Sequence, residues 1–226
     1  MKKKKKIKAS YYLDALEAWL DKNGHAGWDP YDIWDHRFGL WASKRNSLLQ
    51  KIAAVLFTRI TNQLPNFSRK LLKTKKKINP KAMGLFAYSY ILLANHYKKN
   101  EELSKSYKEK AKVCIDWLLK NAVHDFGGMG WGYPFDWQSR VLIQRNTPTV
   151  VNSSIIGDAF WMDYKLNGNI DSLEVCKKIC NFFIEGLNKK KITNESICLS
   201  YTPVDTFEVH NANLLGANFL IRIGTH

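Results

Sequence analysis

The sequence predicts an all-α protein of repeated helical hairpins, arranged as an α/α toroid or as a partial, half toroid. Three observations predict it. Apolar residues recur at three- and four-residue spacing, no run alternates with the period of a strand, and one pattern of helix starts occurs three times. The 226 residues suffice for one domain or for part of a larger one. At 45% hydrophobic and 13% aromatic, the composition is typical of globular proteins.

The chain divides into a short basic tail and one helical domain. We expect the tail over 1–10 and a single helical-hairpin domain over 11–226, with a basic linker at 66–78. Apolar stripes at helical spacing predict helices over the following ranges: 11–21, a long extra helix at 39–62, 84–97, 107–119 and 173–187.

An internal repeat supports the hairpin architecture. Three predicted helices begin with Asn followed five residues later by Gly, at Asn79–Gly84, Asn152–Gly157 and Asn211–Gly216. Asn is a favourable N-cap, so we expect each helix to start at its Asn. Glycine inside a helix is less favourable than alanine by about 1 kcal/mol, so its recurrence indicates close approach of another helix or of a ligand. We expect close packing of helices.

The loops repeat as well. Long aromatic loops end in Pro-x-Asp at Pro134–Asp136 and Pro203–Asp205, and a third copy, Pro30–Asp32, follows the first helix. Successive hairpins place equivalent loops at the same end of a stack. We therefore expect the three Pro-x-Asp loops to gather on one face, around the mouth of a central cavity.

The number of predicted helices is too small for a closed ring. The chain contains about seven, whereas a closed ring of six hairpins needs about twelve. The sequence therefore predicts either a truncated piece, which we favour, or a half-ring that a partner chain completes.

Three segments carry a resemblance to a known family: Gly127–Gln138, Asn146–Pro148 and Val209–Gly216. Within them, the Gly-Trp-Gly-Tyr-Pro-Phe-Asp-Trp run of 130–137 is the most specific. The sequence resembles a family of α/α-toroid proteins encoded with bacterial cell-surface polysaccharide biosynthesis genes, related to six-hairpin glycosidases and terpenoid cyclases. The resemblance runs from about Tyr31 to the end of the chain. It implies a toroid fold and a setting in polysaccharide metabolism rather than one reaction.

Asp32, Asp136 and Asp205 are the candidate catalytic residues, because paired carboxylates act as acid and base at a glycosidic bond. The alternative is that an Asp two residues after Pro organises the turn. His210, beside Asn211, is a candidate proton donor or acceptor, and the alternative is a histidine bound to the loop backbone.

Aromatic and basic residues beside these carboxylates are the candidate ligand-binding residues. Trp131, Tyr133 and Trp137 surround Asp136, where we expect them to stack on a sugar and to raise the pKa of the carboxyl by desolvation. Filling a helical core is the alternative role for such aromatics. Tyr201 precedes Pro203–Asp205, the last Pro-x-Asp along the chain. Arg140 and Arg145 are positioned to clamp an acidic substrate, with a plain surface role as the alternative. The candidate substrate-binding residues are thus Trp131, Tyr133, Trp137, Arg140, Arg145 and Tyr201.

The net charge of +15 comes almost entirely from 28 Lys, against 7 Arg. A dedicated nucleic-acid binder uses more Arg, so we expect no specific nucleic-acid partner. Two basic clusters, Lys2–Lys6 with Lys8 and Arg69–Lys77, are candidates for an anionic membrane surface or a polyanionic glycan, with simple solvation as the alternative. The sequence contains no metal-ligand or nucleotide-binding motif, so we expect no metal and no cofactor.

Three functions follow as hypotheses. The first is an enzyme of bacterial surface-polysaccharide metabolism acting on a sugar polymer or nucleotide sugar, and the second is a non-catalytic glycan-binding or assembly protein. The third is a truncated fragment without activity.

We expect a cytoplasmic protein for two reasons. The acidic residues Asp14 and Glu17 interrupt any apolar segment that could serve as a secretion signal. We also expect the four cysteines to be reduced thiols rather than disulfides; they are Cys114, Cys176, Cys180 and Cys198.

Overall fold

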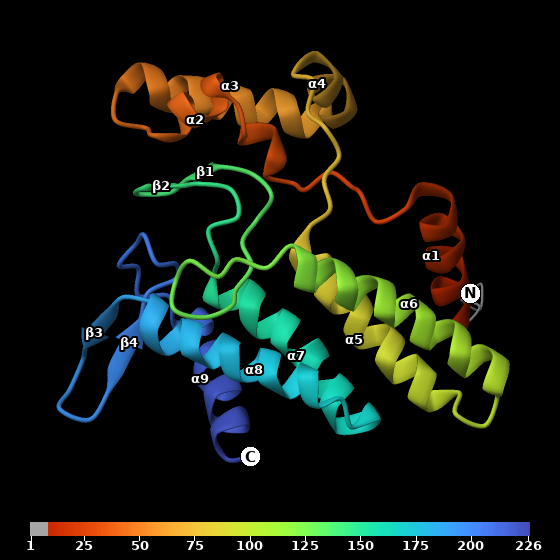
Figure 1. Cartoon of the computed structure of the whole chain (residues 1–226). Helices are drawn as coiled ribbons and strands as arrows, with labels where there is room; N and C mark the ends of the chain where they lie inside the picture. The colour runs from red at the N-terminus through yellow and green to blue at the C-terminus, as the bar shows by residue number, and fades with distance from the viewer. Residues whose placement is uncertain (1–8) are drawn as a thin grey trace, which may run out of the picture.

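The computed structural model describes residues 9–226 and is mostly helical (Figure 1). The lysine cluster at Lys2–Lys6 and Lys8, predicted as part of a basic tail, lies outside the described residues. The helices, in chain order, are α1 (Ala9–Asn23), α2 (Arg37–Ser43), α3 (Leu48–Gln63), α4 (Pro65–Leu71), α5 (Pro80–His96), α6 (Glu101–Lys120), α7 (Val150–Asn167), α8 (Ile170–Asn181) and α9 (His210–Gly224). A 3-10 turn spans Asp32–Trp34, and a π-helical turn, Phe182–Gly186, follows α8.

Two short antiparallel strand pairs lie in the long loops. Strand β1 (Trp137–Gln138) pairs with β2 (Leu142–Ile143), and β3 (Lys189–Lys191) pairs with β4 (Ile197–Leu199). The helical class is therefore correct, and these hairpins are an addition that the sequence analysis did not predict. Strands of two or three residues are too short to carry a recognisable alternation.

The main body consists of α5–α9. Helix α5 packs against α6 and α7, and α7 packs in turn against α8 and α9 (Figure 1). The recurring glycines lie where these helices approach most closely. A Cβ at Gly84 would lie 2.7 Å from the Cγ1 atom of Ile156, and one at Gly157 would lie 2.4 Å from the ring of Phe219. The predicted close packing is confirmed at both glycines.

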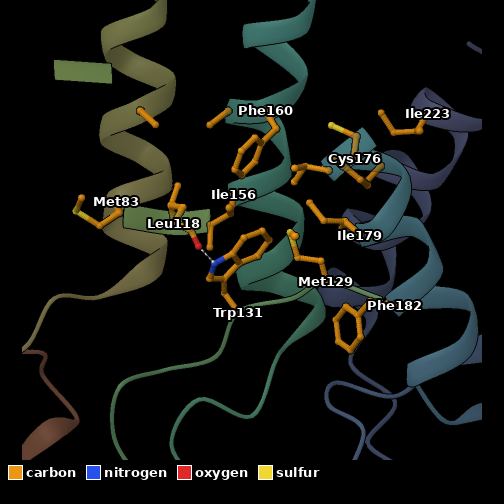
Figure 2. Close-up of a cluster of buried hydrophobic side chains, with 14 of the residues drawn as sticks. Met83, Leu118, Met129, Trp131, Ile156, Phe160, Cys176, Ile179, Phe182 and Ile223 are labelled. Atoms are coloured by element: carbon orange, nitrogen blue, oxygen red, sulfur yellow. Dashed lines mark hydrogen bonds between the residues drawn. The ribbon is translucent and has the colours of Figure 1, made fainter. Parts of the chain in front are cut away.

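The core of this body is formed by large apolar side chains from α5–α9 and the intervening loop (Figure 2). Trp131 is fully buried at its centre, stacked on Phe160 with ring centroids 6.0 Å apart. Its indole Nε1 donates a hydrogen bond of 2.9 Å to the Leu118 carbonyl. All four cysteines are free thiols, and Cys114 and Cys176 are buried in this core.

Two of the three predicted helix starts were wrong. The Asn79 side chain caps α5 by accepting a hydrogen bond from the Lys81 amide. Helix α7 instead starts at Val150, with Thr149 as its cap, so Asn152 lies inside the helix with its side chain buried. Helix α9 begins at His210 without a side-chain cap, one residue before Asn211. Thr149 is itself a good N-cap and lies three residues earlier, so it takes the role predicted for Asn152.

The predicted long helix over 39–62 was also wrong, because two helices replace it. The chain turns at Arg45, whose φ is 54°, and α3 then starts in a capping box formed by Ser47 and Gln50. Likewise the predicted linker at 66–78 is partly helical, since Pro65 occupies the first turn of α4.

Helices α2–α4, residues 37–71, form a separate layer at one edge of the molecule, which we call the α2–α4 unit (Figure 1). The chain enters and leaves this unit side by side. Gly27 and Lys77 exchange two backbone hydrogen bonds of 3.0 and 2.9 Å, which hold the two crossing segments together. Within residues 9–226, no helix has both the length and the apolar character needed to cross a bilayer.

Candidate functional site

A cleft of about 1650 Å³ lies between the α2–α4 unit and the main body. Its walls come from the turn before α2, the α2–α3 connection, the start of α5, the β1–β2 hairpin and the loop after β4. Its aromatic lining consists of Tyr31, Trp34, Tyr133, Phe135, Trp137 and Tyr201. Three of the predicted binding residues, Tyr133, Trp137 and Tyr201, are therefore brought together.

The aromatic side chains of the second and third Pro-x-Asp loops form one continuous wall. Tyr133 stacks on Phe135 at 5.4 Å and meets Trp137 edge to face at 6.5 Å. Trp137 in turn meets Tyr201 edge to face at 6.1 Å. Burial raises the pKa of both tyrosines, so their hydroxyl groups stay protonated at neutral pH. The wall thus offers flat apolar faces beside uncharged hydroxyl groups.

The charged residues around the cleft are mostly basic. Lys44, Arg45, Lys81 and Arg140 line it, and Asp29 is the one carboxylate among its described lining residues. The Asp29 carboxylate accepts hydrogen bonds of 3.0 Å from the Asn79 side chain and of 3.0 Å from the Tyr31 amide. Its oxygens therefore help to fix the loop and the start of α5, while the surrounding cations favour an anionic ligand.

Asp136 belongs to an ionic network beside the cleft rather than to its lining. Its Oδ1 accepts hydrogen bonds from the Arg145 amide at 2.7 Å and from Arg145 Nε at 3.1 Å. Asp35 accepts from Arg145 at 3.4 Å and from Lys77 Nζ at 2.7 Å. Burial acts to raise the pKa of Asp136, but the hydrogen bonds and charge of Arg145 outweigh it and hold the pKa below its usual value. The predicted rise in this pKa is therefore wrong.

The other two candidate carboxylates hold their own loops. Asp32 is buried, accepts a hydrogen bond of 2.8 Å from the Asp29 amide and forms an ion pair with Arg69 at 3.4 Å. Asp205 is also buried and accepts from the Thr202 hydroxyl at 2.6 Å and from two backbone amides of its own loop, those of Tyr201 at 3.1 Å and Phe207 at 2.9 Å. Neither lines the cleft. This matches the alternative role, in which the Asp after Pro organises its turn.

Three further predicted residues lie away from the cleft. Trp131 is buried in the core, so it fills the core rather than stacking on a ligand, which corrects its predicted role. His210 is exposed at the first position of α9, and Arg145 points to Asp35 and Asp136. Arg140 does line the cleft, and its guanidinium lies 5.9 Å from the ring centroid of Phe207.

Sequence reasoning missed several lining residues. Tyr31 and Phe135 are the middle residues of two Pro-x-Asp triplets and Trp34 lies two residues after one of them, so their positions carried a signal. Lys44 and Arg45 were hidden because they fall in the middle of the predicted long helix over 39–62. A search for the Ser47–Gln50 capping box would have placed them in a connection.

Among the described residues, no three His, Cys, Asp or Glu side chains gather closely enough to hold a metal ion. Comparison of the chain with protein families, with curated proteins and with solved structures gave no match. The candidate site therefore stands on its own geometry.

Proposed function

We propose that this protein binds an acidic glycan in the cleft between the α2–α4 unit and the main body. The observation that carries the proposal is the continuous aromatic wall of Tyr133, Trp137 and Tyr201 in a cleft whose lining also includes four basic side chains. Sugar rings stack on flat aromatic faces through their C–H groups, and flanking hydroxyl groups accept and donate hydrogen bonds to sugar hydroxyls. Lysine and arginine then favour a uronate- or phosphate-bearing sugar over a neutral one.

A binding role has more support than a catalytic one. Acid and base catalysis at a glycosidic bond requires two carboxylates on either side of it. Asp32, Asp136 and Asp205 are held by ion pairs and backbone amides outside the cleft lining, which leaves Asp29 as the single described carboxylate there. We therefore place the protein among non-catalytic glycan-binding or assembly proteins.

The wider setting is part of the same proposal. Helix α5 pairs with α6, and α7 pairs with α8. Helix α7 also contacts both α5 and α9. This arrangement is compatible with an arc of an α/α toroid. The resemblance of Gly127–Gln138 to the toroid family supports a role in bacterial surface-polysaccharide biosynthesis. That setting and the free thiols support a cytoplasmic site of action.

Thermal melting with a panel of neutral and acidic oligosaccharides tests the proposal. A ligand at 100 times its dissociation constant adds about 2.7 kcal/mol of stability. In a chain of this size that corresponds to a rise in melting temperature of about 5–10 °C. We expect such a rise with uronate- or phosphate-bearing oligosaccharides and a smaller one with neutral sugars. No rise with any member of the panel would contradict glycan binding.

Two variants separate the cleft from the rest of the surface. Trp137→Ala should weaken binding by about tenfold or more, because it removes the centre of the aromatic wall. Trp19→Ala, which changes an exposed tryptophan on α1, is the matched control and should bind as wild type does. If the wild type releases reducing ends from a glycan and Asp29→Asn does not, the protein is a hydrolase rather than a non-catalytic binding protein.

A further inference from the structure

The exposed side of the α2–α4 unit is unusually apolar. Leu48, Leu49 and Val55 on α3 are 75%, 66% and 64% exposed, and Phe67 and Leu71 on α4 are 60% and 70% exposed. Further exposed apolar side chains on the same unit are Phe38, Trp41, Ile52, Leu56, Ile60 and Leu64. Many exposed apolar side chains on one unit normally mark a contact with a partner or a membrane.

On α3, most of the exposed apolar residues lie along one face of the helix. Leu49, Ile52, Leu56 and Ile60 follow one another at three- and four-residue spacing, so they form a stripe along α3. Residues two apart lie about 200° around a helix, which puts Thr58 on the side opposite Leu56. Thr58 lines the cleft. The apolar stripe therefore faces away from the cleft, and covering it leaves the cleft open.

The charge of the same segment has one sign. No Asp or Glu occurs between Asp35 and Glu101. Residues 37–78 carry eleven basic side chains: Arg37, Lys44, Arg45, Lys51, Arg59, Arg69, Lys70, Lys73, Lys75, Lys76 and Lys77. Arg69 and Lys77 are bound to Asp32 and Asp35. Arg59 is exposed and lies three residues after Leu56, so it flanks the apolar stripe on α3, and Lys70 on α4 is exposed three residues after Phe67.

We propose that the exposed face of α3 and α4 docks in the plane of an anionic lipid bilayer. Apolar side chains of one helix face enter the boundary between headgroups and acyl chains, while long basic side chains extend to the phosphates. Phe38 and Trp41, exposed on the neighbouring α2, supply aromatic rings of the kind found at membrane interfaces. This inference concerns a different surface from the glycan cleft and goes beyond the proposed function.

Charge favours a bilayer over a second copy of the chain on this face. Two copies meeting through α3 and α4 would bring like charges such as Arg59 and Lys70 of both copies together, with no acidic residue in 37–78 to compensate them. An anionic membrane supplies both the apolar layer and the negative charge in one plane. The position of α3 and α4 along one edge of the molecule, away from α5–α9, leaves the face accessible to a flat surface (Figure 1).

Vesicle flotation of the full chain tests this inference. The probes are vesicles of phosphatidylcholine alone and of phosphatidylcholine mixed with phosphatidylglycerol. We expect the wild type to float with the anionic vesicles and not with the neutral ones. Raising NaCl to about 1 M, where the screening length falls to about 3 Å, should weaken the binding.

Matched variants identify the surface. The triple variant Leu49→Ser, Ile52→Ser, Leu56→Ser and the double variant Arg59→Glu, Lys70→Glu should each reduce binding about tenfold or more. Leu214→Ser with Ile221→Ser, which changes two exposed residues of α9, should bind as wild type does. Thermal melts of all variants establish that each still folds.

Several results would overturn the inference. One is the absence of wild-type flotation, and another is equal binding to neutral and anionic vesicles. A third is loss of binding in a chain with Lys2–Lys6 and Lys8 replaced by Gln while the α3 variants still bind. A fourth is wild-type self-association in sedimentation velocity that the triple variant abolishes, without vesicle binding. The last outcome would assign the face to an interface between copies.

Discussion

Asp35 accepts a hydrogen bond of 3.1 Å from the backbone amide of Asp136, which joins two loops that are 101 residues apart in the chain. The same carboxylate binds Arg145 of the main body and Lys77 of the segment that returns from the α2–α4 unit. Asp35 is thus the principal polar connection between the two walls of the cleft.

Replacement of Asp35 should loosen that connection. The Asp35 side chain is 7% exposed, and its charged hydrogen bonds are worth about 1.5–3 kcal/mol each. We expect Asp35→Ala to lower the free energy of unfolding by about 2–4 kcal/mol and to weaken glycan binding, measured by urea unfolding and by titration. Asp116→Ala, which removes an exposed i,i+4 partner of Lys112, should change stability by less than about 0.5 kcal/mol. Equal effects of the two variants would contradict this role.

The two tryptophans of the Gly-Trp-Gly-Tyr-Pro-Phe-Asp-Trp run should separate stability from binding. Trp131→Ala removes a fully buried side chain and its hydrogen bond to Leu118, so we expect a loss of about 3–5 kcal/mol in urea unfolding. Trp137 is only half-buried, so Trp137→Ala should cost less, about 1–2 kcal/mol, and should reduce ligand affinity. A folded, stable Trp131→Ala variant with a specific loss of binding would restore the sequence-based role of Trp131.

The repeated glycines make a packing prediction. A Cβ at Gly157 would meet the Phe219 ring at 2.4 Å and Ile179 at 3.2 Å. Overpacking costs about 1–3 kcal/mol, and the better helix propensity of alanine offsets about 1 kcal/mol of it. We expect Gly157→Ala to destabilise by up to about 2 kcal/mol in chemical denaturation. The control is Gly224→Ala at the end of α9, where the added Cβ meets nothing and stability should hold or rise slightly.

The buried thiols should resist labelling and limit stability at high pH. Burial raises the pKa of Cys114 to about 11 and of Cys176 to about 12, so only about 0.1% or less of either is thiolate at pH 8. With Ellman's reagent in native buffer we expect the partly exposed Cys198 to react first, and Cys198→Ser to remove that fast phase.

The sign of the pH effect follows from the same shifts. The folded state favours the protonated thiols, so their contribution is complete below the unfolded pKa of about 8.5 and is lost as pH rises toward 11 and 12. Unfolding free energies measured from pH 7 to pH 11 should therefore fall above about pH 9. The fall should be smaller in Cys176→Ala than in the wild type. An identical slope in both would assign it to other groups.

The helices of the main body were predictable because their signals are local. Pro80 after Asn79 fixes the start of α5, and the apolar stripe of α6 follows from spacing alone. The start of α7 was not predictable from its Asn-Gly pattern, since Thr149 and Asn152 are both good caps. In the structure the Thr149 hydroxyl caps α7 by accepting from the Asn152 amide, and Gly157 packs against Phe219.

The candidate site was predictable only in its aromatic half. Tyr133, Trp137 and Tyr201 are marked by the Pro-x-Asp loops, which do meet. The pKa of Asp136 depends on Arg145, which is nine residues away and which the β1–β2 hairpin brings back beside it. Trp131 and Trp137 have similar sequence surroundings, yet Trp131 is buried in the core and Trp137 lines the cleft. The packing of α6 and α7 around Trp131 makes the difference.

The paired hydrogen bonds between Gly27 and Lys77 bring the two ends of residues 28–76 together. Directly paired residues of an antiparallel pair lie about 5.5 Å apart at their Cα atoms, so the chain returns almost to the point where it left. The intervening stretch is topologically an insertion, and a two-residue turn could bridge its ends. Excising it would remove one wall of the cleft and the whole bilayer-facing surface, yet leave the helical array contiguous. The cleft and the exposed apolar face of α3 and α4 would then be separable from the scaffold by a single deletion.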